Sequence, residues 1–398
     1  IGKYEIIANY TMNIFNNNTI NELKKLGTTV VTPSIEANKN ILQSLCNNSI
    51  LPVELICYGR GILMNTSYCL LGKSNKCYPE CKMNCKNDSK YYLKDRLGFK
   101  FRVIPDNIQT VTSIYNSKIT SIDTLDLPCY SLRINILDEN INEINNIIQS
   151  VLQDYALTCG VTPFNGKVII TEDMAKSYLD LRSDLVQNGM SDITDIQRYH
   201  GLTVQPMVAD GTFTILLNKD YIVESMNKQN VDWLGTLVHE AVHVNDFKDY
   251  FRIISPDSYD ELYDYNQHRI FQYWTEFHAR AIGHYFLRKY TLDNFKDAVH
   301  IENLLNVELP YQINYMVTEV AATDNADRQM YVVVHFLGRL ATWQHLYPDT
   351  FNARFIKMLT NSNPWLEELY YSLTKYDTLE DAYLHFTDIK GILDKHFS

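Results

Sequence analysis

Two histidines four residues apart, His239 and His243, lie in the otherwise apolar stretch GTLVHEAVHVNDF at positions 235–247. Residues at i and i+4 of an α-helix share one face, so both imidazoles can reach a single ion through their ring nitrogens. Imidazoles in so apolar a helix are costly to bury without a partner. The stretch therefore predicts a buried central helix that carries a metal site. A core helix whose histidines are simply hydrogen-bonded is the alternative.

Glu240 follows the first histidine, in the pattern HExxH. It lies about 100° further round the helix, so its carboxylate borders the ion without binding it. A carboxylate there can take a proton from a zinc-bound water and later pass it to a leaving amine. HExxH on a helix is the pattern of zinc peptidases, although the bare pattern also occurs by chance. We therefore predict Zn²⁺ as cofactor and Glu240 as the catalytic residue in peptide-bond hydrolysis.

A catalytic zinc ion usually has three protein ligands and one open position, so a third ligand is expected. Glu276, in the stretch YWTEFHARAIGHY, shares a helix face with two small residues that would allow close approach to the first helix. Glu276 is the predicted ligand, and His278 could replace it only if that helix were rotated. Asp246 lies about 10 Å along the axis from His239. It is therefore predicted to fix the tautomer of His243 instead.

Two further parts of a peptidase site are expected near these helices. The strand-like stretch GTFTILLNKDY, residues 211–221, is predicted to be an edge strand that pairs with an extended peptide or protein substrate. A side chain that stabilises an oxyanion is also expected, and the sequence leaves several alternatives open. These candidates are Tyr273, Arg280, His284, Tyr331 and His335.

Over residues 205–290 these motifs resemble the zincin metallopeptidases of gluzincin type. The resemblance is carried by the HExxH stretch and by a downstream E-F-x-A in YWTEFHARAIGHY. It implies a mainly helical α+β metallopeptidase domain with His239, His243 and Glu276 as zinc ligands. The helical and aromatic-rich texture of residues 154–398 agrees with such a domain, with helices expected at 233–251, 266–290, 328–346 and 364–376.

Residues 1–153 differ in their expected secondary structure, because strand-like and helix-like segments alternate. This rhythm predicts parallel strands joined by crossover helices. Strands are expected within 3–16, 28–34, 100–106 and 129–138, and helices at 19–27, 36–45 and 141–153. The glycine at the end of the first of these helices is expected to cap it.

Four of the eight cysteines crowd into one stretch of this first domain: Cys69, Cys77, Cys81 and Cys85. In a large chain without a secretory signal, crowded cysteines are more often metal ligands than disulfides. Four thiolates suit a [4Fe–4S] cluster or a second, tetrahedral Zn²⁺. Unliganded thiols in a degenerate copy of such a site are the third alternative.

The segments around these cysteines, YGRGILMNTSYC and YYLKDRLGFKFRV, resemble the collagenase-like family of peptidases of unassigned catalytic type. The resemblance implies a partial TIM-like barrel, and several members carry an iron–sulfur cluster and act in RNA base hydroxylation. Thr110 or Val111 stands where the family commonly has a further cysteine. Because the chain opens at Ile1, we expect only the later strands of the barrel. An iron–sulfur RNA-modifying protein is therefore the alternative function, and a non-catalytic zinc-binding module is a third.

Composition limits the partners of the chain. Hydrophobic residues make up 45%, charged residues 21%, and the formal net charge is −11. This balance argues against electrostatic attraction of the C-terminal domain to nucleic acid or to an anionic membrane. We find neither an apolar run of about 18 residues nor the pattern of a signal peptide. A cytoplasmic protein without a membrane partner is expected.

Overall fold

The computed structural model describes residues 6–72, 91–106, 111–121, 127–137, 144–184, 195–228, 230–291, 298–360 and 364–397. The chain divides into two compact units, Ile1–Thr158 and Cys159–Ser398. This division lies close to the domain boundary expected at residue 154.

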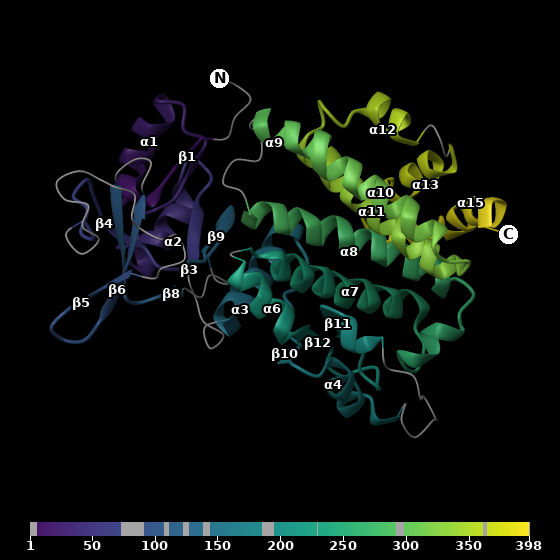
Figure 1. Cartoon of the computed structure of the whole chain (residues 1–398). Coiled ribbons are helices and arrows are strands. Elements are labelled where there is room, and N and C mark those ends of the chain that lie inside the picture. Colours follow the sequence, from purple (N-terminus) through teal and green to yellow (C-terminus); the bar gives the residue numbers. More distant parts are fainter. Residues whose placement is uncertain are drawn as a thin grey trace. The chain divides into compact units, whose positions relative to one another are not determined.

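The first unit combines short strands with three helices (Figure 1). The side chains of Asn16 and Asn38 cap its first two helices by accepting backbone N–H groups. Gly27, with a φ of 97°, ends the first helix in a conformation that favours glycine. The elements of this unit are β1 (Ile7–Ala8), η1 (Tyr10–Met12), α1 (Asn17–Lys25), β2 (Val30–Val31), α2 (Lys39–Asn48), β3 (Glu54–Gly59), β4 (Ile62–Thr66), β5 (Tyr91–Lys94), β6 (Lys100–Asp106), β7 (Val111–Tyr115), β8 (Thr120–Ser121), β9 (Ser131–Asn135) and α3 (Ile144–Cys159).

The expected parallel strands are present in this unit. β1 pairs in parallel with β2, a parallel bridge joins Val31 to Val53 beside β3, and β3 pairs in parallel with β9. Helices α1 and α2 connect successive strands, as the alternation of segments predicts. A second, antiparallel sheet has the order β4-β7-β6-β5. The strands within the described ranges form no closed barrel, and the partial TIM-like barrel stays a prediction.

The cysteine stretch follows β4. Cys69 is a partly buried free thiol in the turn after this strand. Cys77, Cys81 and Cys85 lie outside the described residues. The expected metal cluster of this stretch therefore stays a prediction.

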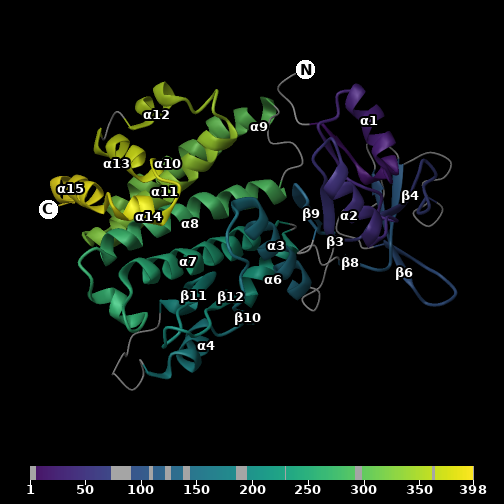
Figure 2. The same ribbon diagram turned by 180° about the vertical axis from the view of Figure 1, so that it is seen from behind.

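The second unit is mostly helical and carries one small sheet (Figures 1 and 2). Its elements are β10 (Lys167–Thr171), α4 (Met174–Leu181), η3 (Ile196–Arg198), β11 (Gly201–Val204), β12 (Thr214–Asn218), α6 (Lys219–Asn227), α7 (Asp232–Ile254), η4 (Asp260–Asp264), α8 (His268–Thr291), α9 (Ala298–Asn303), the π-helical η5 (Leu304–Glu308), α10 (Leu309–Ala321), α11 (Ala326–Leu346), α12 (Ala353–Thr360), α13 (Pro364–Thr374), α14 (Leu379–Tyr383) and α15 (Phe386–Phe397).

Helices α7, α8 and α11 form the centre of this unit, with α8 in contact with both of the others. Glycines allow the close approach. A Cβ added at Gly283 of α8 would lie 2.7 Å from the carbonyl oxygen of Gly235 and 3.0 Å from Cβ of His239 on α7. A Cβ at Gly338 of α11 would lie 2.9 Å from Cβ of Arg280 on α8. The expected contact between the HExxH helix and the helix of Glu276 is thus confirmed.

The sheet of this unit corrects the expectation for residues 211–221. Strand β12 lies in the middle, paired in parallel with β10 and antiparallel with β11. It is therefore a central strand, and β11 is the edge strand that contacts α7. The reason is visible in β12 itself, because Thr214, Ile215, Leu216 and Leu217 are all buried, as in a strand covered on both faces. Within the described part of the chain, we find no helix with the length and apolar character needed to span a membrane.

Candidate metal centre

The side chains of His239, His243 and Glu276 converge at the contact between α7 and α8. Nε2 of His239 lies 3.1 Å from Nε2 of His243 and 3.6 Å from Oε2 of Glu276. Nε2 of His243 lies 3.7 Å from Oε1 of Glu276. Ligands bound at about 2.0–2.1 Å to a tetrahedral zinc ion are about 3.3 Å apart, so the two ring nitrogens and the carboxyl group of Glu276, which turns one oxygen to each of them, have a spacing that suits one ion. The structure thus brings together the three residues predicted as ligands.

A hydrogen-bond relay fixes the tautomer of His243. Oγ1 of Thr275 donates to Oδ2 of Asp246 at 2.7 Å. Because the hydroxyl of Thr275 has a single proton, its Oγ1 must accept the hydrogen bond from Nδ1 of His243, which is 2.9 Å away. His243 therefore carries its proton on Nδ1 and turns the lone pair of Nε2 toward His239 and Glu276. Asp246 is predicted to fix the tautomer of His243. In the structure it acts on His243 through Thr275 and not by direct contact.

His278, the second candidate ligand on α8, faces another partner. Its Nδ1 lies 3.0 Å from Oδ1 of Asp246, and its ring packs against Trp274 at a centroid distance of 4.8 Å. Glu276 is therefore the residue of α8 that meets the histidine pair.

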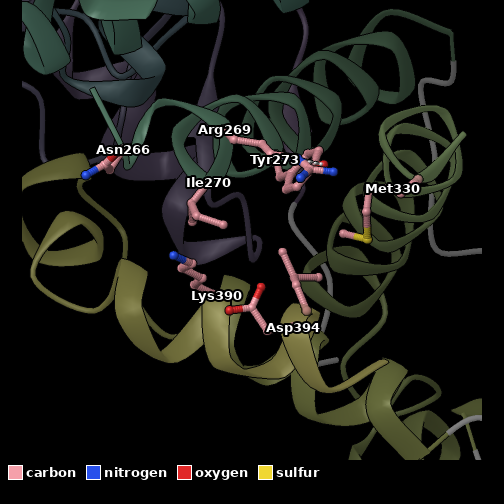
Figure 3. A pocket seen from close by; sticks show the side chains of 9 residues that line it. Asn266, Arg269, Ile270, Tyr273, Met330, Lys390 and Asp394 are labelled. Carbon is pink, nitrogen blue, oxygen red and sulfur yellow. Dashed lines mark hydrogen bonds between the residues drawn. The ribbon is translucent and has the colours of Figure 1, made fainter. Parts of the chain in front are cut away.

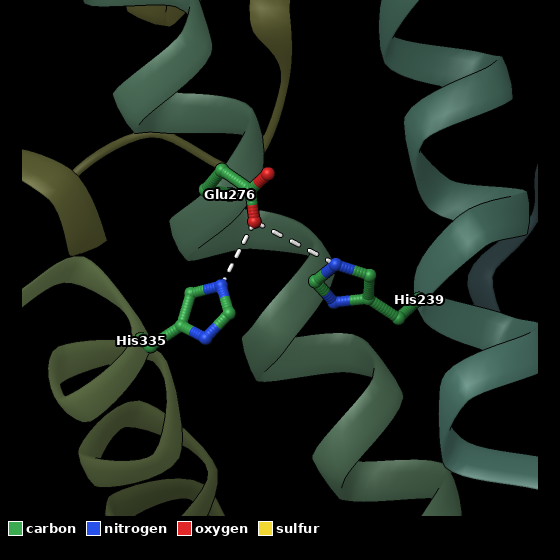
Figure 4. Close-up of side chains that lie close together, drawn as sticks. All are labelled: His239, Glu276 and His335. Atoms are coloured by element: carbon green, nitrogen blue, oxygen red, sulfur yellow. Dashed lines mark hydrogen bonds and ion pairs between the residues drawn. The ribbon is translucent and has the colours of Figure 1, made fainter. Parts of the chain in front are cut away.

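His335 on α11 brings a further imidazole to the same carboxylate (Figure 4). Its Nε2 lies 2.8 Å from Oε2 of Glu276, so His239, Glu276 and His335 also form a group compact enough for a metal ion. The contact of Arg280 with His335 favours the set that contains His243. Nη2 of Arg280 lies 2.9 Å from Nδ1 of His335, and a guanidinium only donates. Nδ1 therefore accepts, and the proton of neutral His335 is on Nε2, where it blocks metal binding.

Glu240 faces the edge strand β11. Oγ1 of Thr203 donates to Oε2 of Glu240 at 2.8 Å. It lies equally close to the backbone carbonyl oxygen of Glu240. Gly201 leaves room for the carboxylate, because a Cβ there would lie 2.9 Å from Cγ and 3.0 Å from Oε1 of Glu240. The strand thus holds the carboxylate in one place beside the histidine pair.

Burial dominates the electrostatics of the centre. It raises the pKa of Glu276 to about 8, with the charge of Glu240 adding to the effect, and raises the pKa of Glu240 to about 7. It also lowers the pKa of His243 to about 4, and the pKa values of His239 and His335 well below their usual range. Neutral imidazoles beside carboxyls that resist ionisation form a donor set that a cation stabilises strongly.

Without metal, the stability of the chain is expected to fall as the pH rises from about 6.5 to about 8. The pKa of Glu276 is raised from 4.5 to about 8 by folding. Its contribution to stability is therefore complete below pH 4.5 and is lost as the pH rises through 8. Buried histidines such as His243, whose pKa is lowered from 6.5 to about 4, act in the opposite sense, but only below pH 6.5.

Calorimetric melting with a chelator present measures this effect. Glu276→Gln should flatten the decrease in the melting temperature between pH 6.5 and 8. Glu368→Gln, at an exposed position of α13, should leave it unchanged. A melting temperature that rises over this range would contradict the assignment of Glu276 as a buried, proton-binding carboxyl.

Thr275→Val is expected to lower zinc affinity about 10- to 100-fold, the usual cost of losing a group that orients a metal-binding histidine. Valine has the shape of threonine but neither donates to Asp246 nor accepts from His243. Competition with a chromophoric chelator measures the affinity. Thr342→Val is the matched control, because Thr342 is also buried but donates to the carbonyl of Ala281 on α8 and takes no part in the relay. Unchanged affinity in Thr275→Val would rule out the relay.

Tyr273, a predicted oxyanion residue, is directed elsewhere. Its hydroxyl contacts Asp327 and Nε of Arg269, the latter at 2.8 Å. Together with Lys390 and Asp394, it lines a cavity of about 270 Å³ between α8, α11 and α15 (Figure 3). This cavity contains none of the residues that converge on Glu276.

The remaining oxyanion candidates lie along α8 and α11. The ring of Tyr331 packs on that of His335, with centroids 3.9 Å apart. His284 is buried two turns beyond Glu276 on α8. Of the five candidates, His335 therefore hydrogen-bonds to the carboxyl group of Glu276, and Arg280 hydrogen-bonds to His335.

Sequence reasoning missed Thr275, Thr203 and Gly201. Thr275 directly precedes the predicted ligand, which was an available signal, whereas the approach of Thr203 and Gly201 to Glu240 depends on strand pairing far along the chain. Comparison of the chain with family models, with curated proteins and with solved structures gave no match. The chemistry of the centre is therefore argued from its geometry.

Proposed function

We propose that the second unit is a zinc-dependent metallopeptidase. The observation that carries the proposal is the close approach of three side chains: the Nε2 atoms of His239 and His243 lie 3.1 Å apart, and each lies 3.6 to 3.7 Å from one carboxyl oxygen of Glu276. Glu240 is the second support, because a structural metal site has no use for a buried carboxylate held beside the ligands. A bound zinc ion would polarise the scissile carbonyl and make an attacking water more acidic.

Each surrounding residue has a task in such a reaction. Glu240, held by Thr203, takes a proton from the attacking water and delivers it to the leaving amine. His335 presents an N–H at the edge of the centre, oriented by Arg280, where it can stabilise negative charge on the carbonyl oxygen. His243 is kept as a lone-pair donor by Thr275.

The edge strand β11 supports a peptide as the substrate. Among the described strands it pairs on one side only, with β12, and it contacts the helix of the HExxH pattern. An extended peptide could add to its open edge through backbone hydrogen bonds. The role expected for residues 211–221 thus passes to Gly201–Val204.

A peptide mixture incubated with the zinc-loaded full chain tests the proposal, with new termini identified by mass spectrometry. Cleavage that stops with a chelator and returns with zinc is the expected result. A zinc-loaded protein that cleaves no peptide would contradict the proposal. The iron–sulfur alternative stays a prediction from sequence, since Cys69 is the one member of its cysteine stretch within the described residues.

A further inference from the structure

Beyond the metal centre, basic side chains continue along the contact between α8 and α11. Arg280, His284 and Arg288 follow Glu276 at i+4, i+8 and i+12 on α8, so each lies one turn beyond the previous residue, and the row winds round the helix by about 40° per step. Arg339 lies one turn beyond His335 on α11. These four basic residues, here called the arginine cluster, are Arg280, His284, Arg288 and Arg339.

The cluster carries more positive charge than its partners neutralise. Arg280 donates to the neutral ring of His335, and Arg339 donates to the side-chain oxygen of Gln312 on α10. Arg288 forms an ion pair with Glu308, and the other carboxyl oxygen of Glu308 lies 4.0 Å from Nε2 of His284. Across the described ranges, no carboxylate forms an ion pair with Arg280 or Arg339.

Several nitrogen atoms of the cluster are buried without a hydrogen bond to the described residues. Nε of Arg280, Arg288 and Arg339 and Nε2 of His284 form no hydrogen bond with any residue that the structure describes. His284 is only 9% exposed, and its Nε2 lies 4.0 Å from Oε1 of Glu308. Buried donors without acceptors destabilise a folded protein. A bound anion would therefore stabilise the cluster.

The electrostatics show that these side chains act on one another. Burial and then the charges of Arg288, Arg339 and Arg280 lower the pKa of His284 well below its usual range. Burial and then Arg280 lower the pKa of Arg339 to about 10, against the opposing charge of Glu308. An anion placed among them would relieve this repulsion.

We propose that the arginine cluster binds a carboxylate, and that this carboxylate is the free C-terminus of a peptide substrate. The inference rests on the peptidase function proposed above. Guanidinium groups match carboxylates through paired hydrogen bonds, whereas an internal peptide group would leave the charge of the cluster uncompensated.

The spacing along the helices agrees with this substrate. Arg280 follows Glu276 by four residues, about 6 Å along the helix axis. One residue of an extended peptide spans about 3.3–3.6 Å. A carbonyl at the metal centre therefore places the α-carboxylate one or two residues further along within reach of Arg280 and Arg339. The enzyme would then be a carboxypeptidase that removes one or two residues.

The reaction balances without another reactant. The C–N bond of the peptide breaks, the oxygen of water joins the acyl carbon, and its protons pass to the new carboxyl group and to the leaving amine. The products are a shortened peptide and a free amino acid or dipeptide. The released carboxylate is the one that the cluster holds.

The test compares three peptides of one length on the zinc-loaded full chain carrying Glu240→Gln, by isothermal titration calorimetry. One ends in a free carboxylate, one in a carboxamide, and one in a carboxamide but with an internal glutamate. The free acid is expected to bind about 10- to 100-fold more tightly than the amide, the range for hydrogen bonds to a charged group. Adding Arg339→Gln should remove the preference and leave the zinc content unchanged.

Arg354→Gln is the matched control, because Arg354 is an exposed arginine on α12 and the preference should persist without it. Arg339→Lys keeps the positive charge but lacks the paired N–H groups of a guanidinium, so it should retain part of the preference for the free acid. Thermal melting verifies that the variants fold, and the acid-to-amide comparison itself needs no change in the cluster.

Equal affinity for the acid and the amide would overturn the proposal, as would an acid preference that survives Arg339→Gln. Binding of the internal glutamate as tightly as the free terminus, or of none of the three peptides, would also overturn it. Cleavage of amide peptides at internal bonds would leave the peptidase function standing without the cluster's role. A clear preference for the free acid in a protein that hydrolyses no peptide would support carboxylate binding by the cluster and contradict the peptidase function.

Discussion

Glu240→Gln should reduce kcat/KM for peptide hydrolysis by about 10²- to 10⁴-fold, the contribution usual for general acid–base catalysis. Glutamine keeps the shape of the side chain, and its carbonyl oxygen can still accept from Thr203 at the edge strand. It cannot take a proton from the attacking water. Because the ligand atoms belong to other residues, the variant should keep its metal, measured as zinc per chain.

Glu224→Gln is the control for this prediction. Glu224 lies on α6, is 62% exposed in its side chain and pairs with Lys228, so its removal should not change kcat/KM. Two results would contradict the role of Glu240. Full activity in Glu240→Gln would exclude it as the proton-transfer group, and loss of zinc would make it a ligand.

His335→Gln should lower kcat by about 10²- to 10³-fold, the cost of losing one donor to a developing oxyanion. Arg280 holds the proton of His335 on Nε2, so this residue is assigned as a hydrogen-bond donor and His243 as the ligand. The variant should therefore retain zinc, whereas His243→Gln should lose it. Kinetics with a chromogenic peptide and zinc content measured on the same samples separate the two effects.

His345→Gln, an exposed histidine near the end of the same helix, is the control and should change neither quantity. Loss of zinc in His335→Gln together with its retention in His243→Gln would reverse the assignment. The ligands would then be His239, Glu276 and His335. That outcome would also require Arg280 to move away from Nδ1 of His335 when the metal binds.

The helices of the centre could be predicted because their signals are local. The apolar run around His239 and His243 indicates a buried helix, and α7 extends over Asp232–Ile254, slightly beyond the expected 233–251. Glu276 could be found because a small residue on its face, Gly283, indicates close helix packing, and the structure has Gly283 against Gly235.

The relay and the strand could not be predicted from the same kind of signal. Thr275 links Asp246 to His243 only because α8 is rotated to a particular angle against α7, which residue spacing does not fix. Strand order depends on pairing between distant segments, and the stretch at 211–221 does not itself indicate that Lys167–Thr171 pairs with it. Its four consecutive buried residues are the sign of a central strand.

The role of Arg280 also depends on a contact between two helices. Its position on α8 made it one of five candidates for stabilising an oxyanion, and sequence spacing could not choose among them. Its contact with Nδ1 of His335 turns it into the residue that sets a tautomer. With its basic neighbours on α8 and α11 it forms the arginine cluster, which appears in the sequence only as separate basic residues.

Elemental analysis of the purified full chain tests the central claim most directly. The account predicts about one zinc per chain after extensive dialysis. It predicts that this zinc is lost in His239→Ala and kept in His385→Ala, a histidine of the second unit that pairs with Asp388 at the surface. Zinc that is unchanged in His239→Ala, or iron in place of zinc, would contradict a metal centre built on α7 and α8.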